Sequence, residues 1–507
     1  MASVSYRTSD AITWAIGALL GYIALRVVYN LFFHPLRKIP GPIGHRSSEL
    51  PNVFSLLRGK WTRDVLPLVE KYGPVVRIGP NHLIFTDPDA WKDIYSHHNG
   101  AVVKGEEFEK NMLFYRNKGV QPSILSETRD NHALIRRQLS HGFSEKSLRD
   151  QEPIIKGYVD LLMKRLRERC VPVRGAGTET ESGLESKTAF DMRRWYTFTT
   201  FDVIGDLAFG EPFGCLEKGE ANERVTTIER GLTSQNFGIA VKLLGLERLL
   251  EVLVRGRAVF RRNIMQQMTD TLRRRMELSI ERPDLIEGLL RKKEDWNIPF
   301  NLLRANATIL VIAGSETTAT LLSGITYLLL KNPECLEKAK EEVRSSFTHE
   351  DDITFSSVQN LSYMLACLKE ALRCYPPVAG TLARIAPKGG AHVAGHFVPE
   401  GTAVSIAQWP MFHSSRNFSD SFSFKPERFL EPEKFPNDRL DAVQPFSVGP
   451  RDCIGKNLAY AEMRTILARL LVNFDMELAD PEQDWLDQKV FFLWTKPPLN
   501  VYLTPVR

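Results

Sequence analysis

The chain has 507 residues, of which 43% are hydrophobic, 25% charged and 10% aromatic, as in ordinary globular proteins. This composition excludes a collagen-like fibre, a disordered tail protein and a polytopic membrane protein. The net charge of +5 is too small over this length to favour binding of nucleic acid. The six cysteines form no C-x-x-C pair, so neither a disulfide framework nor a zinc ribbon is predicted, and a reducing compartment is the simplest interpretation.

The first predicted element is an apolar helix near the N-terminus. Residues 11–33 read AITWAIGALLGYIALRVVYNLFF, with Arg26 and Asn30 as the strongly polar members. Such a helix spans ~35 Å, enough for the ~30 Å hydrocarbon core of a bilayer. A cleaved signal peptide is the alternative, but its apolar stretch is shorter and ends at a small-residue cleavage site. We therefore predict an uncleaved transmembrane anchor, preceded by a short lumenal segment, residues 1–10.

The charges that flank this helix predict its orientation. Arg7 and Asp10 cancel before it, whereas Arg37 and Lys38 follow it, so the bulk of the chain is expected in the cytoplasm. The next segment, residues 34–44, is rich in proline and is predicted to be a stiff hinge. The rest of the chain shows no repeat and no long linker. We predict one large domain over residues 45–507.

Within this domain, strand-like segments are few and helical periodicity dominates. Residues 75–78 and 82–86 predict a hairpin, and an extended stretch is expected after Pro376-Pro377. Apolar residues at helical spacing predict one face of an amphipathic helix near the C-terminus: Met463, Ile466, Leu467, Leu470, Leu471 and Phe474. The predicted fold class is mainly α with a minor β-sheet.

A second long apolar segment lies between Pro299 and Pro333. It would form a helix ~50 Å long, and polar members such as Arg304 and Glu316 favour a buried central helix over a second membrane span. Residues 313–318 in its middle read AGSETT. Threonine competes for backbone carbonyls, so small residues beside hydroxyls can open a helix locally.

The most informative segment is residues 446–455, FSVGPRDCIG, directly before the amphipathic helix. Cys453 then lies at a helix N-terminus, where backbone N–H groups and the helix dipole favour thiolate. Such a thiolate can act as a nucleophile, a redox sensor or an axial metal ligand, whereas a buried structural cysteine is the functionally neutral alternative. A nucleophile needs a base, and no histidine is adjacent in sequence. Gly449 and Gly455 permit close approach of the backbone to a flat partner.

This decapeptide resembles the haem-thiolate signature of the cytochrome P450 family, F-x-x-G-x-R-x-C-x-G. Upstream, residues 370–373 (EALR) resemble the family's E-x-x-R helix, residues 426–429 (PERF) its P-E-R-F segment and residues 313–318 its A-G-x-[DE]-T segment. With the anchor and the hinge, the resemblance covers nearly the whole chain, and it is most similar to enzymes of fungal secondary metabolism. The five matching positions of the signature are Phe446, Gly449, Arg451, Cys453 and Gly455.

The resemblance implies a haem b cofactor (iron protoporphyrin IX) with Cys453 as the axial ligand of the iron. Phe446, Gly449 and Gly455 are expected to contact this haem. His132 stands where the family's W-x-x-x-R helix has tryptophan, which weakens the match but keeps a hydrogen-bond donor. The cationic residues expected to hold the haem propionates are His132, Arg136, Arg384 and Arg451.

Roles in catalysis and folding are likewise implied by the resemblance. Glu316 is expected to deliver protons, and Thr317 to stabilise oxygen intermediates. A charge-assisted triad is expected to hold the cysteine loop against the core: Glu370, Arg373 and Arg428. The substrate pocket is expected to have as walls residues 102–125, residues 213–250, the central helix near Ala313, residues 378–382 and the turn near Trp494.

The leading hypothesis is a monooxygenase that inserts one oxygen atom of O2 into a lipophilic small molecule, a polyketide or terpenoid, by hydroxylation or epoxidation. No G-x-G-x-x-G follows a strand, so electrons are expected from a separate NADPH–cytochrome P450 reductase at the endoplasmic reticulum membrane. The alternative is a haem-thiolate isomerase or dehydratase that needs neither O2 nor reductase, and the intact Glu316-Thr317 pair argues against it. A haem sensor and a cysteine hydrolase remain as further hypotheses.

Overall fold

The computed structural model describes residues 2–96, 107–116, 121–170, 188–247, 258–278, 282–293, 295–296 and 298–506. Parts of the predicted pocket walls, residues 102–106, 117–120 and 248–250, lie outside the described residues. The longer helices are α1 (Ala2–Val28), α3 (Leu50–Arg58), α4 (Trp61–Tyr72), α7 (Arg129–Leu139), α8 (Glu145–Cys170), α9 (Met192–Phe209), α11 (Glu223–Thr233), α12 (Gln235–Leu243), α14 (Ala258–Glu277), α16 (Phe300–Lys331), α17 (Pro333–Ser346), α18 (Ser362–Cys374) and α20 (Lys456–Asn473). Shorter helices are α2 (Ile43–Ser47), α5 (Asp89–Tyr95), α6 (Met112–Tyr115), α10 (Cys215–Lys218), α15 (Glu287–Arg291) and α19 (Gln408–His413).

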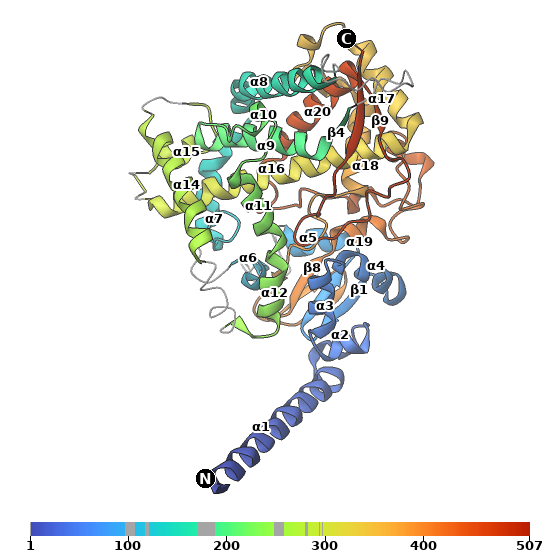
Figure 1. Cartoon of the computed structure of the whole chain (residues 1–507). Coiled ribbons are helices and arrows are strands. Elements are labelled where there is room, and N and C mark those ends of the chain that lie inside the picture. Colours follow the sequence, from blue (N-terminus) through green and yellow to red (C-terminus); the bar gives the residue numbers. More distant parts are fainter. Residues whose placement is uncertain are drawn as a thin grey trace, which may run out of the picture.

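The anchor helix projects away from the globular part (Figure 1). It begins at Ala2, before the predicted start at residue 11, and continues beyond α1 as a π-helical turn over Tyr29–Phe33. Asp10–Phe33 is long and apolar enough to cross a membrane, and none of its most apolar part is buried. Apolar side chains on all its sides therefore face outward, as in a helix that lipid surrounds.

The hinge is tied to the domain by hydrogen bonds as well as stiffened by its prolines. Arg77, fully buried in β1, donates from its side chain to the carbonyl oxygen of Asn30 at 2.9 Å and from its backbone N–H to that of Pro40 at 2.8 Å. The Asn30 amide in turn donates to the carbonyl oxygen of Ser47 at 2.8 Å. The end of the anchor is thus attached to the first strand of the sheet, a contact that the sequence did not predict.

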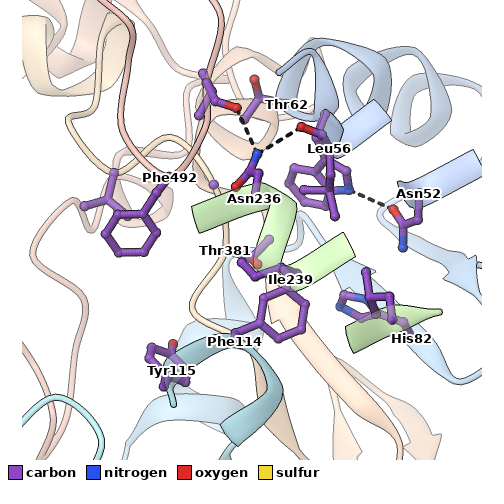
Figure 2. Close-up of a pocket in the computed structure, with 15 residues that line it drawn as sticks. Asn52, Leu56, Thr62, His82, Phe114, Tyr115, Asn236, Ile239, Thr381 and Phe492 are labelled. Atoms are coloured by element: carbon purple, nitrogen blue, oxygen red, sulfur yellow. Dashed lines mark hydrogen bonds between the residues drawn. The ribbon is translucent and has the colours of Figure 1, made fainter. Parts of the chain in front are cut away.

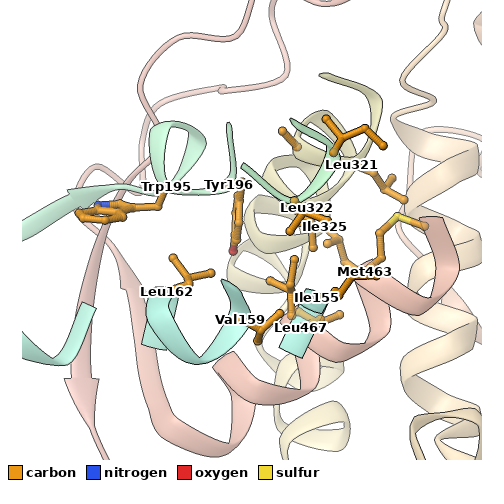
Figure 3. Packing of buried hydrophobic residues seen from close by; sticks show 14 of the residues in the cluster. Ile155, Val159, Leu162, Trp195, Tyr196, Leu321, Leu322, Ile325, Met463 and Leu467 are labelled. Carbon is orange, nitrogen blue, oxygen red and sulfur yellow. The ribbon is translucent and has the colours of Figure 1, made fainter. Parts of the chain in front are cut away.

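The predicted central helix is α16. It follows Pro299 and ends at Lys331, one residue before Asn332-Pro333, and 67% of its most apolar part is buried, so it is a core helix rather than a second span. Helix α9 packs along it, and α18 and α20 contact it as well. In the core, Ile155 of α8, Tyr196 of α9, Ile325 of α16 and Leu467 of α20 come together (Figure 3).

The C-terminal helix confirms the predicted amphipathic face. All six apolar residues between Met463 and Phe474 that define this face are buried. The helix itself ends at Asn473, and Phe474 begins the strand that follows. Because this face packs into the core cluster, it holds the N-terminus of α20, and with it the cysteine loop, at a fixed place.

The strands form small sheets at one side of the helical core. The predicted hairpin is present as β1 (Val75–Gly79) and β2 (His82–Phe85), paired antiparallel, and β2 pairs in parallel with β8 (Ala403–Ile406). The stretch after Pro376-Pro377 is extended and contains β5 (Arg384–Ile385). The five-stranded sheet has the order β1-β2-β8-β5-β3. The other strands are β3 (Glu109–Lys110), β4 (Ala189–Asp191), β6 (Ala391–Val393), β7 (His396–Val398), β9 (Phe474–Leu478) and β10 (Asn500–Pro505). The fold is mainly α with a minor β-sheet, as predicted.

Candidate active site

The middle of α16 carries the predicted oxygen-activating segment. The helix is continuous here, and the Thr317 hydroxyl donates to the carbonyl oxygen of Ala313 at 2.6 Å. The expected competition of threonine for a carbonyl is therefore present, but it does not interrupt the helix. Ala313 is exposed although Ser315 and Glu316 close to it are buried, so this face of α16 is not covered by other side chains. Thr317 is half-buried beside it.

Glu316, the neighbouring acid, is buried and faces a partner that no motif indicated. Its Oε2 accepts a hydrogen bond from the Lys496 ammonium at 2.9 Å. Its Oε1 is buried without a hydrogen-bond partner among the described residues. The two members of the predicted catalytic pair therefore have different surroundings: Thr317 bonds to its own helix, and Glu316 is bound to the C-terminal segment.

The cysteine loop leads directly into α20. The backbone N–H of Cys453 donates to the carbonyl oxygen of Phe446 at 2.9 Å, and that of Asp452 donates to the carbonyl oxygen of Gly449 at 3.1 Å. The Phe446 ring packs on Tyr460 with centroids 5.3 Å apart. The loop is thus closed on itself and held on the helix that follows.

Cys453 is exposed as a residue, yet the protein around it desolvates its thiol. Burial raises the pKa of this thiol and outweighs the backbone N–H of Gly455, which lowers it. The expected preference for thiolate from the helix terminus is therefore not the dominant effect in the polypeptide alone. A coordinating metal deprotonates a thiol outright, so an iron ligand at this place would be thiolate whatever the thiol's own pKa.

Gly449 and Gly455 of the cysteine loop differ in the space that is available for a side chain. Gly449 has φ +80°, and a Cβ there would lie 2.0 Å from the carbonyl oxygen of Tyr95, whereas a Cβ on Gly455 would lie 3.6 Å from the ring of Phe143. We expect Gly449→Ala to prevent correct folding of the loop, because both strain and overlap oppose it. Gly455→Ala is the matched control and should leave the apoprotein's thermal unfolding temperature nearly unchanged. Equal unfolding temperatures for both variants would contradict this reading.

The cationic residues predicted for the propionates converge on one place. Burial, followed by the charges of neighbouring cations that include Arg451, Arg136 and Arg384, lowers the pKa of His132 to about 3, so all four groups lie close together. The guanidinium of Arg136 donates to the carbonyl oxygen of Asp452 at 2.6 Å and to its carboxylate at 2.5 Å. Arg136 thereby also ties α7 to the cysteine loop.

A fifth cation in this cluster is Lys110 of β3, which sequence reasoning missed because no motif marks it. Its ammonium donates to the carbonyl oxygen of Leu125 at 2.5 Å. Burial, followed by repulsion from Arg384 and Arg451, holds the pKa of Lys110 well below its usual range. The cluster borders a polar pocket of about 420 Å³ that Lys110, Glu127 and Arg451 line.

These residues fit a haem. Mutual repulsion among several cations indicates a site for anions, and the two propionate carboxylates of a haem supply them. Arg384 is buried, and its Nε has no hydrogen-bond partner among the described residues. Cys453 is exposed and in no disulfide, so its sulfur is available to a ligand, and Ala313 and Thr317 lie on a face of α16 that is not fully packed.

The predicted triad is assembled in the core. Both Glu370 oxygens accept hydrogen bonds from Arg373 at 2.8 Å, and one accepts from Arg428 at 3.3 Å. All three side chains have no exposed surface. Asp438, which the motifs did not indicate, is a further ion-pair partner of Arg428. Two carboxylates therefore face two guanidinium groups in this network.

A separate pocket lies on the side of the domain near α3 and α12 (Figure 2). Its lining comes from three of the predicted walls, through Phe114, Ile239 and Thr381. The last wall is contributed by Phe492 rather than Trp494, whose ring stacks on Tyr375 with centroids 4.7 Å apart. The pocket does not include Ala313, so it lies apart from the middle of α16.

Comparisons with known proteins agree with this geometry. The sequence profile of the family named Cytochrome P450 matches residues 49–503. The chain is 46% identical to the cytochrome P450 monooxygenase tpeC of Talaromyces stipitatus, over 98% of this chain and 95% of that protein. It is 42% identical to the cytochrome P450 monooxygenase prhB of Penicillium brasilianum, over 97% of each chain. It is 43% identical to the trichothecene C-15 hydroxylase of Fusarium sporotrichioides, over 96% of this chain and 97% of that protein.

Proposed function

Since this chain belongs to the cytochrome P450 family, we propose that it hydroxylates or epoxidises a lipophilic polyketide or terpenoid. It is a cytochrome P450 monooxygenase, an oxidoreductase related to enzymes of fungal secondary metabolism. The electrons come from NADPH through a separate reductase. The observation that supports the proposal is the exposed Cys453 of the signature loop together with the cation cluster of His132, Arg384 and Arg451, which Arg136 ties to that loop.

Each residue of the site has a distinct part in this reaction. The haem, when bound, supplies the iron at which O2 is activated, and Cys453 as thiolate is its protein ligand. The guanidinium groups of Arg384 and Arg451 balance the propionate charges, and His132 and Lys110, whose pKa values are lowered in the polypeptide alone, donate hydrogen bonds to the same carboxylates. Arg136 binds Asp452 and so holds the cysteine loop at a fixed place against α7.

The proton needed in oxygen activation is held on α16. Thr317 keeps its hydroxyl near the exposed face of the helix by donating to Ala313. Glu316 is the acid that takes a proton from the solvent side and releases it towards this face. The apolar and aromatic lining of the pocket at Phe114, Ile239 and Phe492 excludes water and favours a lipophilic substrate on its way in.

We also propose a division of the chain into a lumenal segment (1–10), a transmembrane anchor (11–33), a hinge (34–44) and a cytoplasmic catalytic domain (45–507) at the endoplasmic reticulum membrane. Exposed apolar side chains on the contacting helices α3 and α12, at the anchor end of the domain, support contact with lipid (Figure 1). They are Leu50, Phe54, Leu57 and Phe237. Residues 237–254 are apolar enough in sequence to dip into lipid, with a packed helix as the equal alternative, and residues 248–254 of this stretch lie outside the described residues.

The function is tested by growing a fungal host with this protein and a reductase under ¹⁸O2 and analysing its metabolites by mass spectrometry. A new product that carries one labelled oxygen supports monooxygenation and identifies the substrate class. A new product without label that also forms in the absence of the reductase would instead support the isomerase alternative. The control is the same host with an empty vector.

We expect Thr317→Ala to uncouple NADPH consumption from product formation. The hydroxyl bonds to its own helix, and alanine favours helix, so folding should be unaffected. Product formed per NADPH should fall by about 10-fold or more, because organised proton transfer contributes at least that much. Ser323→Ala is the matched control, since Ser323 makes the same bond to its helix at 2.7 Å, two turns away. Unchanged coupling in Thr317→Ala would remove Thr317 from the mechanism.

A further inference from the structure

Glu316 and Lys496 form a buried ion pair between the active-site helix and the C-terminal segment. The Lys496 ammonium lies 2.9 Å from Glu316 Oε2 and donates to the Thr320 hydroxyl at 2.8 Å. Both charged side chains are 5% exposed. Thr320 is one turn after Glu316 on α16, so the single lysine binds two successive turns of the helix at the predicted proton-delivery site.

The segment that carries Lys496 is held on both sides. Before it, the Trp494 indole donates to the carbonyl oxygen of Pro376 at 2.8 Å. After it, the carbonyl oxygen of Pro497 accepts from Trp485 at 3.1 Å, and the N–H of Leu499 donates to the Asp191 carboxylate at 3.0 Å. The backbone that carries Lys496 is therefore held by residues outside α16, and the position of Lys496 does not depend on its bond to Glu316 alone.

Other charges around the pair connect it to the outer helices. Burial raises the pKa of Glu229 on α11, and the charge of Glu316 raises it further, while Arg193, Lys496 and Arg194 act in the opposite direction. Burial raises the pKa of Tyr375 well above its usual range, and the charge of Glu316 acts in the same direction. Glu229 is half-buried and lies near enough to both members of the ion pair to feel their charges.

We propose that Lys496 is a positioning residue that keeps Glu316 ionised and fixed on α16, and thereby controls how readily Glu316 releases a proton. The inference rests on the proposed role of Glu316 in proton delivery. A lone carboxylate in the protein interior is costly, and it takes up a proton when its counter-charge is removed. A carboxyl that holds its proton more tightly is a poorer acid, so delivery would slow. Glu316 Oε1, which has no hydrogen-bond partner among the described residues, is the oxygen that Lys496 does not bind and that is left to carry the proton.

The direct test is infrared spectroscopy of Lys496→Met in the full-length, haem-loaded enzyme. We expect a new carbonyl band of a protonated carboxylic acid in the difference spectrum against wild type. This band should be absent from Lys496→Arg, which retains the charge, and from the double variant Lys496→Met/Glu316→Gln, which lacks the carboxyl. Glu462, whose pKa burial raises to about 8, contributes equally to all variants and cancels. No new band in Lys496→Met would overturn the inference.

The functional readout is product formed per NADPH. Lys496→Met should lower this coupling by about 10-fold, which is less than the ~10²–10⁴-fold that a positioned proton donor contributes as a whole, because Lys496 acts only through Glu316. Lys496→Arg should keep most of the coupling. In a Glu316→Gln background, Lys496→Met should have no further effect, because Lys496 acts through Glu316. An equal fall in both backgrounds would contradict the inference. The control is Lys331→Met on the same helix, where the ammonium is exposed and donates to the carbonyl oxygen of Pro481.

Two further outcomes distinguish the role proposed for Glu316 in proton delivery from the role proposed for Lys496. If Glu316→Gln alone leaves coupling unchanged, the proton-delivery role of Glu316 fails, whereas the infrared band still reports whether Lys496 sets its charge. If Lys496→Met does not fold, removal of both charges in the double variant should restore the thermal unfolding temperature, since no unpaired charge is then buried. A double variant as unstable as Lys496→Met would overturn the inference.

Discussion

Cys453→Ser is expected to reduce monooxygenase activity to background and to remove the thiolate signature from the carbon monoxide difference spectrum. Serine does not supply a thiolate, and electron donation from that ligand favours cleavage of the O–O bond. The loop itself should survive, because its hydrogen bond to Phe446 comes from the backbone of residue 453. Circular dichroism should therefore match wild type.

The matched control for this variant is Cys170→Ser. Cys170 is half-buried at the end of α8, and burial raises the pKa of its thiol, as it does for Cys453. Cys170 lies outside the candidate site, so the Cys170→Ser enzyme should keep the thiolate signature in its carbon monoxide difference spectrum and its monooxygenase activity. A Cys453→Ser enzyme that retains the thiolate spectrum would show that another cysteine is the ligand.

Glu370→Gln is expected to abolish accumulation of folded, haem-loaded protein. It leaves the fully buried guanidinium groups of Arg373 and Arg428 without the carboxylate that they share. Breaking a buried ion pair from one side costs about 3–5 kcal/mol, which is a large fraction of the ~5–15 kcal/mol that stabilises a typical domain. Asp438 continues to bind Arg428, but it makes no ion pair with Arg373 among the described residues. The measurement is haem content per protein together with urea unfolding.

Glu427→Gln is the control, because Glu427 belongs to the same P-E-R-F segment but pairs with the more exposed Lys338 at 3.0 Å. Pairs of this kind contribute at most about 1 kcal/mol, so the variant should bind haem normally. The reading of the triad as a folding requirement would be wrong if Glu370→Gln and Glu427→Gln had the same haem content and unfolding midpoint.

Much of the fold could be predicted because its signals are local. The spacing of apolar residues along α20 and the apolar length of α16 and of the anchor are properties of single segments. The prediction of a buried α16, rather than a second span, relied on polar residues such as Arg304 within it, and its burial confirms it. The predicted span, residues 11–33, agrees with the part of the N-terminal helix that is long and apolar enough to cross a membrane, Asp10–Phe33. The helix itself begins earlier, at Ala2, because residues 2–10 are helical without being apolar.

The site was predicted less evenly. The residues expected at the propionates, His132, Arg136, Arg384 and Arg451, lie close together, and Lys110, which no motif indicated, joins them from β3, the strand paired with β5. The turn near Trp494 lines the pocket, as expected, but through Phe492, whereas the Trp494 ring stacks on Tyr375. Which side chains contact each other across a sheet or a loop depends on segments that are far apart in sequence. A pattern within one short segment therefore does not predict these contacts.

The sequence by itself therefore determined the family, the anchor, the central helix and the loop that presents Cys453, because spacing within short segments encodes each of them. Only the tertiary structure decided that Glu316 is bound by Lys496, 180 residues later, and that Arg77 holds the end of the anchor. It also decided that burial outweighs the helix terminus at the Cys453 thiol. The reason is physical: desolvation and ion pairing depend on everything that surrounds a group, and only the folded chain brings those surroundings together.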